Sequence, residues 1–173
     1  AFGLENLGIE QEIIKERIKK MMETLNITHL AEKAPHELSD GQKQRTALAG
    51  VLAMEPKILI LDEPTSRLDP KTASEFMELM NELCREKGIS IIIVEHRLDL
   101  VLKYADRLII LSNGKIISND KPENVFNYKK LIIPELGIPF STKIYRELAK
   151  AHVEFSKPVT CADDMINEVK KKS

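Results

Sequence analysis

Two short segments of the chain carry residues that could handle phosphate. The first, residues 38–45, reads Leu-Ser-Asp-Gly-Gln-Lys-Gln-Arg and is expected to be a polar loop that opens onto a helix. The second, residues 58–63, is an apolar strand that ends in the adjacent carboxylates Asp62 and Glu63. A loop at a helix start can hold an anion, and carboxylates can hold a metal ion and a water molecule. Together the segments predict phosphate chemistry.

The two carboxylates follow a strand of the kind found in parallel sheets, and ligands bind at the carboxyl edge of such sheets. Asp62 would hold Mg²⁺, directly or through water, and Glu63 would polarise the water that attacks a terminal phosphate. The alternative is that the pair only begins a loop before the next helix. Taken alone, the pair does not decide between these interpretations.

The polar loop is the sharper of the two signals. Ser39 offers a hydroxyl, and Gly41 lets backbone N–H groups approach an anion because it has no Cβ. The helix that follows adds its positive N-terminal end. The alternative is an ordinary helix cap, which explains Ser39 or Asp40 but does not require Gly41 and Gln42 as well.

Two weaker signals follow along the chain. Asp69 precedes Pro70, and this pair is also an ordinary helix start, which is the favoured interpretation when the pair is taken alone. His96 follows the second apolar strand, where a neutral imidazole could bond a terminal phosphate and sense its loss. A lone histidine at a strand end is more often structural.

Composition excludes several classes of function. The chain has 173 residues, which suits one domain with a sizeable core. Its 26 Lys and Arg residues nearly balance its 27 Asp and Glu residues, so no basic field favours nucleic acid. Cys84 and Cys161 lack Cys-x-x-Cys spacing and are expected to be reduced thiols in a cytoplasmic protein. The apolar runs are too short to span a bilayer, and we expect no secretion leader.

Hydrophobic spacing predicts helices and strands in an alternating order. Helices are expected at residues 11–25, 28–33 (capped by Thr28), 42–54, 70–87, 98–104, 122–126, 142–152 and 162–171. Buried strands are expected at residues 57–62 and 90–95, and a hairpin at residues 107–111 and 115–118. Apolar strands that alternate with helices predict an α/β fold with a helix-covered parallel sheet. From residue 131 onward, Pro134, Gly137, Pro139 and Pro158 punctuate what we expect to be a small helical tail.

Taken in order, the four motifs resemble those of the ATP-binding cassette (ABC) ATPases. Residues 38–42 look like the signature motif, and residues 59–64 look like the Walker B strand with its catalytic Glu. Residues 66–70 look like the D-loop, and residues 94–96 look like the switch-histidine loop. These motifs cover about residues 35–97. The flanks, residues 1–8 and 133–169, are similar to ATPase subunits of energy-coupling-factor transporters for cobalt, nickel and vitamins.

The resemblance implies a P-loop NTPase-like fold with helices on both faces of a parallel sheet, and it implies ATP and Mg²⁺ as cofactors. Its implied site residues are the catalytic Glu63 and His96, the metal ligand Asp62, and the nucleotide-binding Ser39, Asp40, Gly41, Gln42 and Asp69. Two residues depart from the family pattern. Asp40 stands where Gly is usual, and its charge near a phosphate could weaken the contact. Arg67 stands where a small residue is common.

The resemblance also implies partners and a location. A second ABC ATPase subunit would form a homo- or heterodimer with this one, and integral membrane subunits would choose the transported metal ion or vitamin. The protein would then be cytoplasmic and would lie on the inner face of the cell membrane through those partners, with no nucleic acid expected.

A Walker A loop, Gly-x-x-x-x-Gly-Lys-Ser/Thr, does not occur in the sequence. The one Gly-Lys pair is Gly114-Lys115, and Ile116 follows it. The chain therefore resembles the C-terminal two-thirds of an ATPase subunit, and alone it is expected neither to bind ATP tightly nor to hydrolyse it. Residues 1–130 would be the C-terminal part of the ATPase domain, with a helical subdomain at about 5–50 and a core at about 51–120. Residues 131–173 would be a helical extension.

Two other functions remain open at this point. A non-transport ABC ATPase that acts on nucleic acid or the ribosome would predict a long coiled coil, a second cassette or a basic insertion, and none is visible. A non-catalytic module would only supply the signature helix to a partner, and nucleotide binding with and without that partner would separate it from a transporter ATPase. The fold also implies that the strand at residues 90–95 has lost a neighbour, which would leave an apolar edge prone to aggregation.

Overall fold

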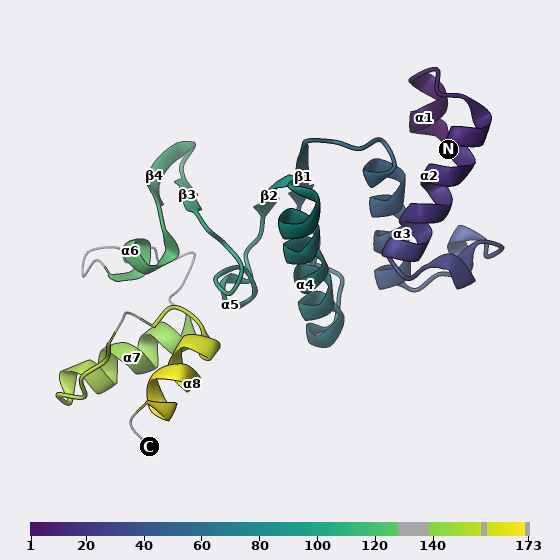
Figure 1. Ribbon diagram of the computed structural model, residues 1–173. Helices are drawn as coiled ribbons and strands as arrows, with labels where there is room; N and C mark the ends of the chain where they lie inside the picture. The colour runs from purple at the N-terminus through teal and green to yellow at the C-terminus, as the bar shows by residue number, and fades with distance from the viewer. Residues whose placement is uncertain (128–138, 157–158, 172–173) are drawn as a thin grey trace. The chain divides into compact units, whose positions relative to one another are not determined.

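The computed structural model describes residues 1–127, 139–156 and 159–171, and the chain divides into two compact units, residues 1–94 and residues 95–173 (Figure 1). The elements of the first unit are α1 (Phe2–Asn6), α2 (Gln11–Thr24), the 3₁₀ turns η1 (Thr28–Leu30) and η2 (Pro35–Glu37), α3 (Asp40–Leu52), β1 (Ile58–Asp62), α4 (Pro70–Lys87) and β2 (Ser90–Val94). Helices and a parallel strand pair alternate, as the hydrophobic spacing predicts.

The N-terminal part of the first unit is a small helical cluster in which α1, α2 and α3 contact one another. Helix α2 buries Ile14 and Met21, and α3 buries Leu48 and Leu52. The predicted helix at residues 28–33 is wrong in extent, because only the single turn η1 forms. Its N-cap is Ile27 and no side chain caps it, so Thr28 does not play the predicted role.

Strands β1 and β2 pair in parallel, with Ile60 opposite Ile92 and Asp62 opposite Val94. Helix α4 joins them and packs on β2. Asp69 caps its start, and Gly88 ends it at a φ of 64°, a left-handed conformation that suits glycine. The buried face of α4 follows helical spacing and consists of Ala73, Phe76, Met77, Met80 and Leu83.

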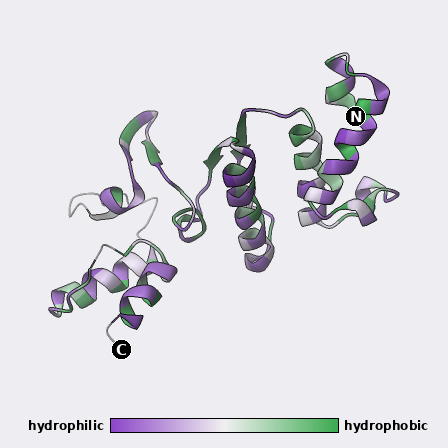
Figure 2. Cartoon of the chain, viewed as in Figure 1, coloured by the Kyte–Doolittle hydropathy of each residue, from purple (hydrophilic) through white to green (hydrophobic). Residues whose placement is uncertain are grey.

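The prediction that both strands are buried on both faces is wrong for this chain. Leu59 is 3% exposed, but its neighbours Ile58 and Ile60 are 59% and 68% exposed. Alternate side chains of a strand point to opposite faces, so the described residues cover one face of the sheet and leave the other open. Figure 2 shows both strands coloured as hydrophobic. The open face, which we call the apolar sheet face, consists of Ile58, Ile60, Ile92 and Val94.

The second unit contains α5 (Leu98–Val101), β3 (Leu108–Ser112), β4 (Lys115–Asp120), α6 (Pro122–Asn127), α7 (Phe140–Lys150) and α8 (Ala162–Lys170). Strands β3 and β4 form the predicted hairpin. Its turn residues Asn113 and Gly114 both have positive φ, at 49° and 72°, which matches a tight hairpin turn. Helix α5 is shorter than predicted. A core cluster joins α5, β3, α6 and the start of α8, and it consists of Leu98, Leu102, Ile110, Val125 and Cys161.

Helices α7 and α8 confirm the two helices predicted for the C-terminal part of the chain. The predicted change of pattern at residue 131, with Pro134, Gly137 and Pro158, lies outside the described residues. Among the described residues, no helix combines the length and apolar character that crossing a membrane requires. Both cysteine thiols are free, and burial raises the pKa of the Cys161 thiol.

Candidate functional site

The predicted metal and catalytic carboxylates stand at the carboxyl end of the parallel strand pair. Asp62 is the last residue of β1 and lies opposite Val94, the last residue of β2. The Glu63 backbone N–H donates a hydrogen bond to the Val94 carbonyl oxygen, at 2.9 Å. The side chains of Asp62 and Glu63 are both exposed. The two strand ends are therefore aligned, and both carboxylates open to solvent at the edge where ligands of parallel sheets bind.

Glu63 has a strained backbone. Its φ is 44°, in the left-handed region that residues with a Cβ seldom adopt. The turn that follows is fixed by a hydrogen bond from the Ser66 N–H to the Glu63 carbonyl oxygen, at 3.2 Å, and by the fully buried Thr65. Strain that the surroundings enforce at a charged residue is a feature of functional sites. It supports the prediction that Glu63 acts on a ligand.

The predicted signature loop is a capping box at the start of α3. Ser39 Oγ accepts a hydrogen bond from the Gln42 N–H at 3.3 Å, and Gln42 Oε1 accepts one from the Ser39 N–H at 3.0 Å. The ordinary capping interpretation therefore accounts for Gln42 as well as Ser39, contrary to the expectation from sequence. The Ser39 side chain is exposed, so its hydroxyl remains reachable for a ligand.

Gly41 also has a packing role. A Cβ at Gly41 would lie 2.9 Å from Thr72 Cγ2, in the first turn of α4, and 3.8 Å from Leu68 Cδ2. Real Cβ atoms essentially never approach other carbon atoms so closely, so a residue with a Cβ at this position would force Thr72 or the start of α3 to shift. This packing is enough to explain a glycine at position 41, and the predicted approach of its backbone N–H groups to an anion stays a prediction.

Asp69 caps the start of α4 with both oxygens of its carboxylate. Its Oδ1 accepts from the N–H groups of Lys71 and Thr72 at 3.0 and 3.1 Å, and its Oδ2 accepts from Thr72 Oγ1 at 2.5 Å. The bond from the Thr72 hydroxyl, followed by that from the Thr72 N–H, lowers the pKa of Asp69. The helix-start interpretation of Asp69 is therefore confirmed, and its nucleotide contact remains a prediction.

Asp40 is the first residue of α3, where a negative charge is favourable near the positive end of the helix. Lys43 Nζ lies 3.7 Å from its Oδ1. This exposed cation offsets part of the charge that Asp40 brings to the predicted phosphate contact. Nothing in the structure explains Arg67, whose side chain is exposed.

Arg45 is a residue of this region to which the sequence assigned no role. Its Nη1 donates to the Leu25 carbonyl oxygen at 3.3 Å, and its Nη2 lies 3.6 Å from Glu75 Oε2. It thereby links the end of α2, the middle of α3 and the first turns of α4. The sequence shows only an arginine within a predicted helix. Its partners are 20 and 30 residues away, so residue spacing could not identify them.

His96 lies in the second unit, two residues beyond the end of β2. Glu95 Oε1 accepts hydrogen bonds from the backbone N–H groups of His96 and Arg97, at 3.1 and 3.3 Å, and so fixes the turn before α5. The imidazole is exposed. The role of His96 in sensing phosphate remains a prediction.

The cofactors that the resemblance implies are Mg²⁺ and ATP. Among the described residues, no group of three or more His, Cys, Asp and Glu side chains could hold a metal ion by itself. Mg²⁺ in phosphoryl transfer is usually held by one or two carboxylates together with the phosphates, so the single exposed Asp62 fits such a role. The phosphates would need a Walker A loop, which this sequence does not contain.

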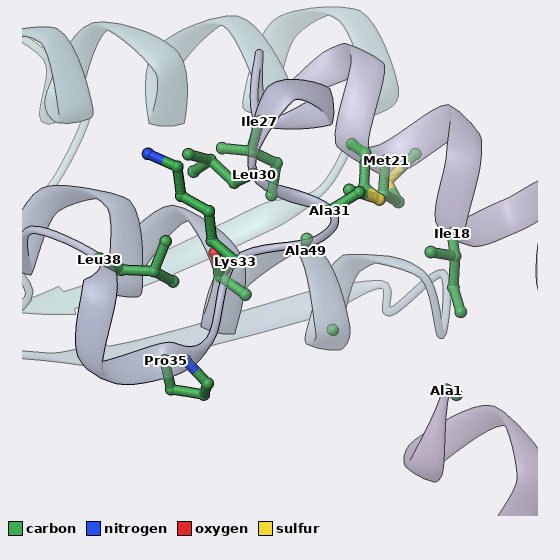
Figure 3. A pocket seen from close by; sticks show the side chains of 13 residues that line it. Ala1, Ile18, Met21, Ile27, Leu30, Ala31, Lys33, Pro35, Leu38 and Ala49 are labelled. Carbon is green, nitrogen blue, oxygen red and sulfur yellow. The ribbon is translucent and has the colours of Figure 1, made fainter.

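A cavity of about 240 Å³ lies in the helical cluster (Figure 3). Neither Asp62 nor Glu63 is among its lining residues. Its lining is mostly apolar and includes Ile18, Met21, Leu30 and Leu38, with Lys33 at its side. An apolar lining offers few hydrogen-bond donors to phosphate oxygens, so this cavity does not suit a triphosphate.

Comparison with known proteins agrees with the motifs. Residues 3–66 match the family described as "ABC transporter". The energy-coupling factor transporter ATP-binding protein EcfA of Methanosphaera stadtmanae is 41% identical over 167 residues, which cover 94% of this chain and 60% of that protein. The protein EcfA2 of Enterococcus faecalis is 38% identical over 174 residues, covering 99% of this chain and 60% of that protein.

A solved structure agrees as well. The structure of cbiO1 from Clostridium perfringens, part of the ABC transporter complex cbiONQ, matches with a TM-score of 0.68 and 44% identity, over 75% of this chain and 51% of that one. The fold is thus that of a P-loop NTPase-like ABC ATPase. The chain is similar to ABC transporter ATPases, and the relatives and the solved structure named here are of the energy-coupling factor and cbiO type. It spans about three fifths of the length of the two curated relatives named here.

Proposed function

We propose that the chain is part of an ATP-hydrolysing subunit of an energy-coupling-factor transporter, which couples ATP hydrolysis to uptake of a metal ion or vitamin. The observation that carries this proposal is the pairing of Asp62 with Val94 at the end of β2. Asp62 and Glu63 therefore follow the carboxyl end of a parallel strand pair, and ligands commonly bind at that end of parallel sheets. Sequence similarity to proteins named as ATP-binding proteins of such transporters supports the proposal.

Each predicted residue has a part in this proposal. Asp62 would be a ligand of Mg²⁺, which neutralises phosphate charge when bound, and Glu63 would orient and deprotonate the attacking water. His96 would hydrogen-bond the terminal phosphate. Ser39, Asp40, Gly41 and Gln42 would present the start of α3 to a nucleotide held by the partner subunit, and Asp69 would sit at the same interface.

The proposal includes an assembly. A second ABC ATPase subunit would complete the nucleotide sites, and integral membrane subunits would hold the pair at the inner face of the cell membrane. Residues 1–130 would form the ATPase part, with its helical subdomain at about 5–50 and its core at about 51–120, and residues 131–173 would be an added helical region. The sequence lacks a Walker A loop, so this chain alone would hydrolyse no ATP.

The first experiment measures ATP turnover by the purified chain alone. We expect none above the level of a Glu63→Gln variant. Turnover that the Glu63→Gln substitution abolishes would overturn the expectation, because it would show that the chain holds and hydrolyses ATP without a Walker A loop.

The second experiment mixes the chain with an intact EcfA-type subunit and measures ATP affinity and turnover. The chain's signature loop should tighten ATP binding by the intact subunit. Any gain in turnover should be at least tenfold smaller with the Ser39→Ala chain than with the parent chain. Lys15→Ala, on an exposed position of α2, serves as the surface control. A chain that neither binds the intact subunit nor changes its ATP affinity would refute the proposal.

A further inference from the structure

Thr72 contacts both of the loops that the proposed function assigns to nucleotide. Its Oγ1 donates a hydrogen bond to Asp69 Oδ2 at 2.5 Å. Its Cγ2 stands 2.9 Å from the place that a Cβ on Gly41 would occupy. The two substituents on one Cβ thus face the D-loop carboxylate and the signature glycine respectively.

In another rotamer, the side chain of Thr72 could not keep both its hydrogen bond to Asp69 and its methyl group against Gly41. Threonine is branched at Cβ, so its hydroxyl and methyl group move together when χ1 rotates. Moving Cγ2 away from Gly41 by a rotamer change would also carry Oγ1 away from Asp69. A displacement of the Gly41 backbone toward α4 must therefore either be resisted or break the bond to Asp69.

A shift of α3 away from α4 would also relieve the contact between Gly41 and Thr72, and Arg45 restricts this shift. Its guanidinium bonds the Leu25 carbonyl oxygen and lies 3.6 Å from Glu75 on α4, and its side chain is only 25% exposed. Charged groups with several partners cost more to displace than single exposed ion pairs. Arg45, one helical turn after Gly41 on α3, therefore helps to keep Gly41 against Thr72.

We propose that Thr72 is a positioning residue that couples the signature loop, residues 39–42, to the D-loop carboxylate of Asp69 within one chain. A change in the position of Gly41 alters the hydrogen bonding of Asp69, although the two residues have no direct hydrogen bond to each other. The meaning of this coupling for nucleotide handling rests on the proposed function, but the coupling itself does not.

The test measures the pKa of the Asp69 carboxyl by carbon-13 NMR titration of the full chain without nucleotide, with Asp69→Asn to assign the signal. Thr72→Val keeps the shape and removes the hydroxyl, so the pKa of Asp69 should rise toward its ordinary value. Thr72→Ser keeps the hydroxyl and removes the methyl group, so the low pKa should persist. These two variants establish the local contact.

The decisive variants place a methyl group on Gly41. Gly41→Ala should raise the pKa of Asp69, because the new Cβ forces Thr72 out of its rotamer. The double variant Gly41→Ala with Thr72→Ser should restore the low pKa, because serine has no Cγ2 to collide with the alanine. Without coupling through Thr72, Gly41→Ala would leave the pKa of Asp69 unchanged and the double variant would have nothing to restore.

Each outcome decides the matter. An unchanged Asp69 pKa in Gly41→Ala, or a double variant that does not recover it, overturns the proposal. If Gly41→Ala does not fold while the double variant does, the proposal is supported by the rescue, and if neither folds it is overturned. Failure here would leave the ATP experiments of the proposed function unaffected, and loss of ATP effects would leave this titration interpretable.

Discussion

The backbone N–H of Glu63 donates to the carbonyl oxygen of Val94 across 2.9 Å, and Glu63 does so with a φ of 44°. The bond continues the pairing of β1 and β2 one residue past Asp62, where the chain must already turn away from the sheet. The left-handed backbone of Glu63 reconciles the two demands. The residue predicted to activate water is therefore held by the sheet at a conformational cost, and this cost can be measured.

Substitution of Glu63 by glycine should stabilise the first unit. Glycine adopts positive φ without a steric penalty, so Glu63→Gly should raise the free energy of unfolding by about 1 kcal/mol. Glu63→Gln keeps the strain and should change it by less than about 0.5 kcal/mol. Urea unfolding followed by helical circular dichroism measures both, and a Glu63→Gly chain that unfolds at lower urea than the parent would contradict the assignment of strain.

The capping box at Ser39 separates stability from ligand contact. Ser39→Ala removes the acceptor for the Gln42 N–H and should cost about 1 kcal/mol of unfolding free energy. Ser39→Asp keeps an acceptor and favourable charge at the helix start, so its stability should stay near that of the parent chain. The two variants are compared by urea unfolding, and equal stability of alanine and serine at this position would show that the cap contributes little.

The Ser39→Asp variant also tests the proposed nucleotide contact. Ser39→Asp brings a second carboxylate beside Asp40, so it should impair the chain's effect on ATP binding by an intact partner subunit even though the chain remains folded. An aspartate variant that supports partner ATP binding as well as the parent would argue that Ser39 does not face phosphate.

The apolar sheet face should make the isolated chain self-associate. Ile60 is 68% exposed, so Ile60→Lys should change the unfolding free energy by less than about 0.5 kcal/mol and should reduce association. Leu59, one residue away on the covered face, is 3% exposed, and Leu59→Ala should cost about 2–5 kcal/mol. Sedimentation velocity over a concentration series measures association, and a parent chain that stays monomeric and folds cooperatively would contradict this prediction.

Glu168 should make the second unit sensitive to acid. Its side chain is 1% exposed and accepts hydrogen bonds from Lys171 Nζ at 2.6 Å, from Ser156 Oγ at 2.5 Å and from the Ser156 N–H at 2.6 Å. The bond from Lys171, then those from Ser156, lower the pKa of Glu168 from 4.5 to about 2. Since the folded pKa is the lower one, the unfolded chain takes up the proton first as the pH falls. The stabilisation is therefore complete above pH 4.5 and is lost as the pH falls toward about 2.

Tyrosine fluorescence can follow this loss, because the chain has no Trp and its three Tyr residues all lie within residues 95–173. Glu168→Gln has no carboxyl to titrate, so it should be less stable at neutral pH and should lose less stability between pH 4.5 and 2 than the parent. Asp163→Asn serves as a control, since Asp163 is 52% exposed and pairs only at the surface with Lys103. A parent and a Glu168→Gln chain with the same acid dependence would rule out this role of Glu168.

Local interactions explain what could be predicted from the residues alone. Apolar spacing gave α2, α4 and the hairpin close to their observed bounds, because a helix face and a tight turn depend on residues within a few positions of one another. Asp69 before Pro70 marked the start of α4, and Gly88 marked its end, for the same reason. The ordered motifs also placed Asp62 and Glu63 at a strand end, where β1 ends in the structure.

Packing between elements decided the rest. The composition of β1 could not tell whether one or both faces would be covered, because cover is supplied by other elements and not by the strand. Nor could spacing show that Gly41 meets Thr72, or that Arg45 reaches Leu25 and Glu75, since these partners lie 20 to 31 positions apart in the sequence. Residues so distant meet only when helices pack, and the free energy of that packing depends on the shapes of both surfaces at once.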